Sequence, residues 1–352
     1  MTSALLLCPA DNFGLLGSYG RAFRRLNVDV AYFHLSDAIQ KHVKFDRIGR
    51  AIAKYLPFEP WVVGGNRDLI HQVMALKPDI LLFAGAIPIR AGALAQIKAA
   101  CPTVRVVLAW PDTMLNLSDN ILACLPMCDL VASYSSTAIP LLERLGARAV
   151  EWFPFAVDEE LFPGDTTLTA QEREALASDV VFIGNHREDR EAAVSNLVNA
   201  GLSVKVWGAG WDRSPRDPVL VGKVHQSNLL IGRELVKAVR AAKVSLNAID
   251  PTNFPAANMR FFEQYACGGV SLSSPCPEME PEFPDGVCGS YYRSDDELVG
   301  KAKELVNNAD LRGRLRSEGR RRALRAHTYV NRAEKMLKVL GLRPGAATSG
   351  HG

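Results

Sequence analysis

The sequence predicts an α/β protein built from two doubly wound parallel sheets. Three observations lead to this prediction. The chain has 352 residues, which is too long for one ordinary hydrophobic core. Short apolar runs alternate with amphipathic segments, as in parallel strands that are joined by helices. This alternation stops once, near residue 155, and then starts again.

The first half of the chain contains the first set of alternating elements. Buried strands are expected at residues 4–8, 28–33, 80–83, 104–109, 130–133 and 149–152. Segments with helical periodicity lie at residues 19–26, 46–55, 67–76, 91–100 and 137–145. Parallel sheets of this kind bind ligands at the carboxyl ends of their strands, so functional residues are expected there.

The second set follows residues 153–165, whose proline and glycine content is typical of a linker. Strands are expected at residues 180–183, 204–207, 221–224, 244–246 and 270–273, and helices at residues 187–200, 229–242, from 258, and within 295–340. We therefore expect two Rossmann-like domains that face each other across a cleft. The first covers residues 1–155 and the second covers residues 156–327, and the tail at residues 345–352 is expected to be disordered.

Composition restricts the classes of function. The net charge of +3 is small, so the overall charge does not predict nucleic-acid binding. Seven cysteines are scattered, and the one close pair, Cys124 and Cys128, has no histidine cluster beside it, so no metal site is expected. The N-terminus lacks the basic start of a signal peptide, and no apolar run approaches the ~20 residues of a membrane span. We therefore expect a cytoplasmic protein without a transmembrane segment.

The most informative segment is residues 258–272, which predict a short helix that ends at two glycines before an apolar strand. Arg260 and Glu263 share one face of this helix, about 4.5 Å apart along its axis. A cation is unfavourable near the positive end of a helix unless an anion binds there. A nucleoside diphosphate would use both residues, with Arg260 and free N–H groups on phosphate and Glu263 on two ribose hydroxyls. A plain salt bridge on a solvated face is the alternative.

The loop at the start of the second domain also follows a strand and opens a helix. Gly184, Asn185 and Arg187 form a candidate phosphate cradle with the N–H groups of that helix. His186 is a candidate catalytic residue, and the alternative is a structural role beside the helix start.

Two further loops in this domain are candidates for donor binding. Gly208 and Gly210 lie between two tryptophans, and this turn serves either structural packing or stacking on a base or sugar. The backbone at Gly222 and Val224 is a candidate for hydrogen bonding to the edge of a nucleobase.

In the first domain, the segment after the first strand contains Asp11, Gly14 and Gly17, a candidate loop for phosphate or acceptor. It is not a dinucleotide-binding fingerprint, because no acidic residue ends the second strand. Asp112 follows the fourth strand, where it could bind an acceptor hydroxyl or act as a base. An ordinary turn aspartate is the alternative reading.

The C-terminal helical region is rich in arginine. A solvated helix face is the simple interpretation, and peripheral contact with anionic lipid or with an acidic acceptor is the functional one. The residues are Arg312, Arg314, Arg316, Arg320, Arg321, Arg322 and Arg325.

Taken together, these motifs resemble the GT-B glycosyltransferases, in particular the CgeB-like (spore-maturation type) branch of the family-4-like retaining enzymes. The resemblance covers roughly residues 179–340 and is architectural in the first half of the chain. The matching segments are residues 179–184, 206–211, 243–247, 259–263, 266–269, 296–298 and 327–329, followed by Arg332.

The resemblance implies a metal-independent, retaining, hexosyltransferase-type enzyme that takes a nucleotide-diphosphate sugar as donor and needs no other cofactor. Glu263 matches the second glutamate of the family's E-x7-E element, which binds the nucleotide ribose. The first glutamate would fall on Pro255, which cannot supply a carboxylate to the donor sugar. The resemblance also implies that the helix at about 328–345 returns to the first domain. A GT-B sugar-nucleotide epimerase or hydrolase, or a non-catalytic binding scaffold, is the alternative function.

Overall fold

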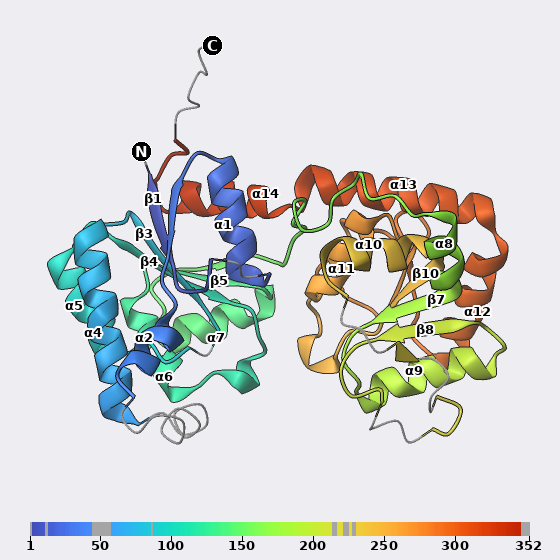
Figure 1. Cartoon of the computed structure of the whole chain (residues 1–352), viewed down its shortest axis with the longest axis horizontal. Helices are drawn as coiled ribbons and strands as arrows, with labels where there is room; N and C mark the ends of the chain where they lie inside the picture. The colour runs from blue at the N-terminus through green and yellow to red at the C-terminus, as the bar shows by residue number, and fades with distance from the viewer. Residues whose placement is uncertain are drawn as a thin grey trace, which may run out of the picture. The chain divides into compact units, whose positions relative to one another are not determined.

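The computed structural model describes residues 2–10, 13–43, 58–85, 87–212, 217–220, 225–226 and 230–345. The chain divides into two compact units, drawn in Figure 1. Unit 1 consists of residues 1–154 and 329–352, and unit 2 consists of residues 155–328. The domain ends expected from the sequence lie one residue from this division.

Unit 1 contains a six-stranded parallel sheet with the order β2-β1-β3-β4-β5-β6. Leu5, Leu81 and Leu108 are among its fully buried residues, because parallel strands are covered on both faces. All of the strands predicted in this half are present. Their bounds are β1 (Ser3–Leu6), β2 (Asp29–Tyr32), β3 (Ile80–Ala84), β4 (Arg105–Trp110), β5 (Leu130–Ser133) and β6 (Val150–Trp152).

The helices of unit 1 include the last helix of the chain. This helix, α14, packs on α1, where the rings of Tyr19 and Tyr329 lie 5.3 Å apart. Arg332 Nε also donates a hydrogen bond to the carbonyl of Pro154, at 2.8 Å. The helix expected at residues 46–55 lies outside the described residues. The helices are α1 (Leu15–Arg25), α2 (Leu35–Lys41), α4 (Glu59–Leu76), α5 (Ala91–Ala100), α6 (Asp119–Cys124), α7 (Ile139–Arg144) and α14 (Tyr329–Val339).

Unit 2 contains a second six-stranded parallel sheet, with the order β12-β11-β10-β7-β8-β9. The edge strands β9 and β12 have two residues each and were not predicted, because such short strands carry no periodic signal. The predicted strand at residues 221–224 lies outside the described residues. The strands are β7 (Ser178–Ile183), β8 (Val204–Trp207), β9 (His225–Gln226), β10 (Ala242–Asn247), β11 (Ser271–Ser273) and β12 (Ser290–Tyr291).

Helices lie on both faces of the second sheet, with α10 and α11 on one side and α9 on the other (Figure 1). The helical block expected at residues 295–340 consists of three helices, α12, α13 and α14. The helices of unit 2 are α8 (Ala170–Leu176), α9 (Glu188–Asn199), α10 (Gly232–Ala241), α11 (Met259–Cys267), α12 (Asp295–Asn307) and α13 (Ala309–Ala326). Both units are therefore Rossmann-like, as the sequence predicts.

The strand order of each sheet reverses at one point. In unit 1 the reversal lies between β1 and β3, and in unit 2 it lies between β7 and β10. Ligands of doubly wound sheets bind beyond the carboxyl ends of the strands at such a point. The two reversal points are therefore the first places to look for a site.

All seven cysteines are buried and none is in a disulfide. This agrees with the small, apolar role that their sequence context indicates. Among the described residues, no helix has the length and the apolar character to cross a lipid bilayer.

Candidate functional site

The loops after β7 and β10 are tied together at the reversal point of unit 2. Arg187 Nη1 lies 2.6 Å from Asp250 Oδ2. Arg190, in the first turn of α9, donates from Nη1 to the carbonyl of Asn185 (2.9 Å) and from Nε to the carbonyl of Ala248 (3.3 Å). These contacts fix the relative positions of two loops that are far apart in the sequence.

Helix α11 begins beside this junction. Its N-cap is Asn258, whose Oδ1 accepts a hydrogen bond from the N–H of Phe261 at 2.9 Å. The amide groups of Asn258 and Asn247 also bond to each other in both directions, at 3.1 and 3.2 Å. Asn247 is the last residue of β10, so this pair anchors the start of α11 at the carboxyl edge of the sheet.

Arg260 and Glu263 contact each other in the first turns of α11, with Arg260 Nη1 2.6 Å from Glu263 Oε2. The side chain of Glu263 is 9% exposed and that of Arg260 is 25% exposed. The salt bridge that the sequence left open is therefore present, but it does not lie on a solvated face. A carboxylate has two oxygens and a guanidinium has five N–H donors, so each member keeps capacity for a ligand.

Charged groups of both signs meet at this edge. Burial lowers the pKa of the Arg190 guanidinium, the negative charges of Asp189 and Asp250 oppose that effect, and the charges of Arg187 and Arg260 add to it. Burial alone would raise the pKa of Asp250, but two hydrogen bonds from Thr252 and the charges of Arg187 and Arg190 outweigh it, so the pKa is lowered. Asp250 is therefore ionised at neutral pH and orients Arg187.

The N-termini of α9 and α11 differ in their suitability for an anion. The first turn of α9 carries Glu188, Asp189 and Glu191, which would repel a phosphate. The first turn of α11 carries no acidic residue. The first N–H groups of a helix have no intrahelical partner, so α11 offers the better anion site of the two.

His186 lies in a structural contact. Its Nε2 lies 2.6 Å from Glu191 Oε2, and its ring meets the ring of Trp211 edge-on at 5.0 Å. Both of these side chains are about a tenth exposed, and Glu191 Oε1 accepts the N–H of Asp217 at 2.7 Å. This geometry favours the structural alternative for His186, because its ring is largely buried between Glu191 and Trp211.

The glycine loops after β7 and β8 pack directly on each other. Gly208 has φ +150°, and a Cβ atom there would lie 2.0 Å from the carbonyl oxygen of Gly184. Trp211 is 1% exposed and donates from Nε1 to that same carbonyl at 2.8 Å. Of the two roles open to this turn, packing is confirmed for Trp211, whose ring has no free face for a base. Gly210 has φ +89°, which explains a glycine at that position.

Three further candidates from the sequence lie outside the described residues, namely Asp11, Gly222 and Val224. In unit 1, Gly14 is the N-cap of α1 with an ordinary φ of −87°. Gly17 lies inside α1 and is buried, so its expected place in a loop is wrong. The helix begins at Leu15, four residues before the start at residue 19 that its apolar periodicity indicated.

A cavity of about 290 Å³ lies at the reversal point of the unit 1 sheet. Residues that follow β1, β2 and β3 line it, which puts Gly14 at the place where the strand order reverses. The lining is mainly apolar with one imidazole, and it includes Cys8, Gly14, Leu15, His34, Ile87 and Pro88.

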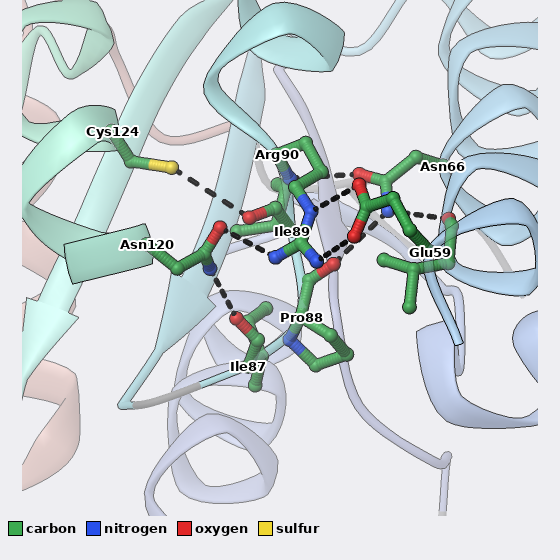
Figure 2. A network of polar contacts seen from close by, with 9 residues as sticks. Glu59, Asn66, Ile87, Pro88, Ile89, Arg90, Asn120 and Cys124 are labelled. Carbon is green, nitrogen blue, oxygen red and sulfur yellow. Dashed lines mark hydrogen bonds and ion pairs between the residues drawn. The ribbon is translucent and has the colours of Figure 1, made fainter. Parts of the chain in front are cut away.

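A polar network holds the loop after β3 that borders this cavity (Figure 2). Arg90 bonds both oxygens of Glu59, at 3.1 and 2.6 Å, and Oδ1 of Asn120 at 2.9 Å. Asn120 donates to the carbonyl of Ile87 (3.0 Å), and Asn66 donates to the carbonyl of Pro88 (3.0 Å). The rim of the cavity is therefore ordered by side chains from three different helices or loops.

Asp112 follows β4 and forms a local turn. Its Oδ1 accepts the N–H of Thr113 at 2.7 Å, and its Oδ2 accepts from Nδ2 of Asn116 at 2.9 Å. Both carboxylate oxygens are occupied by neighbours in the sequence, which favours the turn alternative over a catalytic base.

Comparison with known proteins supports the description of the fold. Residues 187–338 match a protein family described as "Glycosyl transferase-like". No curated protein sequence is significantly similar to this chain. The structure is similar to sucrose-phosphate synthase from Thermosynechococcus elongatus, with a TM-score of 0.66 at 13% identity over 96% of this chain and 98% of that one.

Two other solved structures share this architecture. HepE from Anabaena, in complex with UDP-glucose, has a TM-score of 0.62 at 12% identity over 96% of this chain and 100% of that one. A DNA-modifying β-glucosyltransferase has a TM-score of 0.59 at 16% identity over 97% of this chain and 100% of that one. The chain has the GT-B fold.

Within this GT-B fold, three residues of the candidate site at the carboxyl edge of the unit 2 sheet were not predicted from the sequence: Arg190, Asn247 and Asp250. Asp250 precedes Pro251 and Thr252, a turn signal directly after a predicted strand, and it could have been found that way. Arg190 lies in the middle of an acidic helix start, where nothing in the sequence indicates that its side chain reaches another loop.

Proposed function

We propose that this protein is a glycosyltransferase that moves a sugar from a nucleotide-diphosphate sugar to the hydroxyl or amine of an acceptor. The observation that carries the proposal is the Arg260–Glu263 pair at the start of α11. The pair lies beside the reversal point of a GT-B C-terminal unit, on a helix whose first turn has no competing carboxylate. We further place the chain in the CgeB-like branch, where an Asn-x-Arg segment precedes the glutamate.

In this proposal the diphosphate lies at the N-terminus of α11. Its oxygens accept hydrogen bonds from the first backbone N–H groups and from Arg260, and Glu263 accepts the two ribose hydroxyls. Arg187 adds positive charge, since Asp250 holds its guanidinium at this edge. Gly184 and Asn185 supply the backbone of the loop that closes the other side of the donor.

The chemistry follows from the charges. When the glycosidic bond to phosphate breaks, the leaving diphosphate gains negative charge, and positive side chains and helix N–H groups stabilise it. Arg260, Arg187 and Arg190 can supply that stabilisation, which supports a metal-independent reaction. Retention of the anomeric configuration, by attack on the face from which the leaving group departs, is proposed from the family resemblance. UDP-glucose is the first hexosyl donor to test, because HepE was solved with it.

The acceptor is proposed to bind in unit 1. The cavity at the reversal point of its sheet offers apolar walls and the imidazole of His34. A small acceptor, or the end of a larger one, with an apolar part and a hydroxyl would match that lining.

A non-catalytic nucleotide-sugar-binding scaffold is the second candidate. It is motivated by Pro255, which occupies the position of the first glutamate of the E-x7-E element and cannot supply a carboxylate. Such a protein would bind the donor without transferring its sugar.

The test combines binding with turnover. Melting temperatures are measured with UDP, GDP, dTDP and their hexose derivatives, on the wild type and on Glu263→Ala and Arg260→Ala. We expect one nucleotide series to stabilise the wild type and each substitution to weaken its binding about tenfold to a hundredfold, the loss of one charge-assisted contact. Glu174→Ala, an exposed glutamate of α8, is the control and should bind normally.

Turnover is read by release of the nucleotide in the presence of acceptor candidates. Stabilisation that survives both substitutions would refute the assigned site. Tight donor binding without nucleotide release, with lipid, saccharide and small-molecule hydroxyl acceptors, would favour the scaffold.

A further inference from the structure

A second cavity, of about 880 Å³, lies in unit 2. It is away from the donor-side edge, which is the carboxyl edge of the sheet where the donor is proposed to bind. Its walls come from segments that lead into the starts of β7, β10 and β11, together with α13. The carboxyl ends of the same strands form the donor-side edge, so the cavity is at the opposite edge of one sheet. Among the described residues, the charged side chains of its lining are all arginines, namely Arg173, Arg240, Arg316, Arg320 and Arg321.

Two of these arginines have structural partners at the ends of helices. Arg240 donates to the carbonyls of Cys267 (2.9 Å), Gly164 (3.0 Å) and Thr166. Arg320 Nε donates to the carbonyl of Ala266 at 3.3 Å. Ala266 and Cys267 are the last residues of α11, where a cation stabilises the negative end of the helix. The fold itself accounts for Arg240 and for Nε of Arg320, while the two terminal nitrogens of Arg320 have no hydrogen bond among the described residues.

Arg173 and Arg316 are different. Within the part of the chain that the structure describes, neither side chain has a hydrogen bond or an ion pair, and Nε of Arg316 is buried without a partner. Burial, with the charges of Arg312 and Arg240, lowers the pKa of Arg316. The fold therefore holds at this cavity an exposed guanidinium, that of Arg173, and a half-buried one, that of Arg316, whose Nε is buried without a partner.

The carboxylates around the cavity are committed elsewhere. Glu318 pairs with Arg321 and Arg322, each at 2.7 Å. Asp165 pairs with Arg233 at 3.1 Å, and Glu172 pairs with Lys237 at 2.7 Å. Since these acids have their own partners, they leave the charge of Arg173 and Arg316 unmatched.

We propose that this cavity is a second ligand site, which binds a phosphate-bearing anion through Arg173, Arg316 and Arg320. Arginine binds phosphate with two parallel N–H groups, and several guanidinium groups around one cavity select a multiply charged group over a single carboxylate. The volume admits a phosphate together with an attached organic group. A soluble organic phosphate and the headgroup of an anionic lipid share this chemistry.

The site is independent of the donor. None of its lining residues belongs to the loops at the carboxyl edge, so an anion in the cavity does not occupy the position proposed for the diphosphate of the sugar nucleotide. The C-terminal arginines differ in their contacts. Arg312 binds carbonyls at the end of α12, and Arg321 and Arg322 pair with Glu318. Arg316, Arg320 and Arg321 line the cavity.

The test uses the full chain and two probes, pyrophosphate and vesicles of phosphatidylglycerol. Binding is measured by calorimetry for pyrophosphate and by sedimentation for vesicles, with phosphatidylcholine vesicles as the neutral reference. The variant is Arg173→Gln with Arg316→Gln, because neither side chain has a hydrogen bond or an ion pair among the described residues. The matched control is Arg314→Gln with Arg325→Gln, which removes the same charge from exposed positions of α13.

We expect a binding component for one of the probes that weakens at least about tenfold in the Arg173/Arg316 variant and is unchanged in the Arg314/Arg325 control. This component should also survive Arg260→Gln, which separates it from pyrophosphate bound at the donor-side edge. Binding of pyrophosphate identifies a soluble ligand, and binding of the anionic vesicles alone identifies a lipid headgroup. The proposal is overturned by no binding of either probe, by an equal loss in the control, or by loss of all binding in Arg260→Gln.

Discussion

The two edges of the unit 2 sheet differ in whether their arginines are paired with carboxylates. At the carboxyl edge, Arg187 and Arg260 each lie 2.6 Å from a carboxylate, Asp250 and Glu263 respectively. At the amino edge, Arg173 and Arg316 have no carboxylate partner among the described residues. A paired arginine is oriented before any ligand arrives. An unpaired, partly buried one such as Arg316 carries an electrostatic cost that an anion would remove.

The two edges also differ in their backbone. The carboxyl edge is built from glycine loops in which Gly184 and Gly208 touch. The amino edge is built around the end of α11, whose last carbonyls bind arginine side chains. The loops of the carboxyl edge are therefore held by close backbone contact, and the amino edge is held by contacts between charged side chains and helix carbonyls.

The largest effect is expected for Gly208→Ala, which tests the backbone contact. The new Cβ would lie 2.0 Å from the carbonyl oxygen of Gly184, and φ +150° is a conformation that alanine rarely adopts. We expect the free energy of unfolding to fall by about 3 kcal/mol and donor binding to be lost with the displaced loops. Urea denaturation and nucleotide titration measure the two effects.

Gly201→Ala is the control for this change. Gly201 has φ +84°, but its Cβ would meet no atom within 4 Å. Only the backbone conformation is penalised there, at about 1 kcal/mol, and donor binding should be unchanged. Equal losses in the two variants would mean that the contact between the loops does not matter.

A smaller effect is expected for Asp250→Asn, which removes the charge that holds Arg187. We expect a loss of about 1–2 kcal/mol at pH 7, because a buried charge-assisted contact is replaced by a neutral one. The pKa of Asp250 is lowered in the folded protein. Its contribution is therefore present above the unfolded pKa of about 3.9, and it is lost as the pH falls through the lower, folded value. The measurement is the difference in unfolding free energy between wild type and variant from pH 7 down to pH 3.

The matched background is Arg187→Gln. Arg187 is 53% exposed, so its own removal should cost little, but the cost of Asp250→Asn should shrink when Arg187 is absent. A cost that is the same at pH 7 and pH 3, or in both backgrounds, would show that the carboxylate's charge is not what stabilises this junction.

The sequence predicted most of the fold. Strands such as Leu130–Ser133 and Val204–Trp207 were predicted to the residue. The first is a short buried run, and the second alternates buried apolar residues with the half-buried Lys205. Short elements were missed. The edge strand Ser290–Tyr291 has two residues, and the helix Ala170–Leu176 has no buried residue, so neither carries a periodic apolar signal.

The candidate site was less predictable, because its contacts join residues that are distant in the sequence. Spacing on one helix was enough to pair Arg260 with Glu263. No local pattern relates Arg187 to Asp250, which meet only because β7 and β10 are neighbours in the sheet. The partner of His186 is close in the sequence but was also missed. His186 follows a strand, where an exposed side chain is expected, yet it contacts Glu191 one turn into the next helix.

The smallest effect concerns the amino edge in the absence of any ligand. Arg316→Met keeps most of the side-chain volume and removes a charge whose pKa is lowered by burial and by neighbouring arginines. A cation with a lowered pKa binds its proton more weakly in the folded state, so its charge costs stability at neutral pH. We expect the melting temperature to rise by about 1–2 °C at low salt, corresponding to about 0.5 kcal/mol.

Arg314→Met on the same helix is exposed and should leave the melting temperature unchanged. The gain in Arg316→Met should also disappear in 1 M NaCl, where the screening length is about 3 Å, if repulsion between arginines is its cause. A loss of stability in Arg316→Met would instead make Arg316 a structural residue like Arg240. The two edges of the sheet would then differ in the partners of their arginines and not in the effect of those arginines on the stability of the protein.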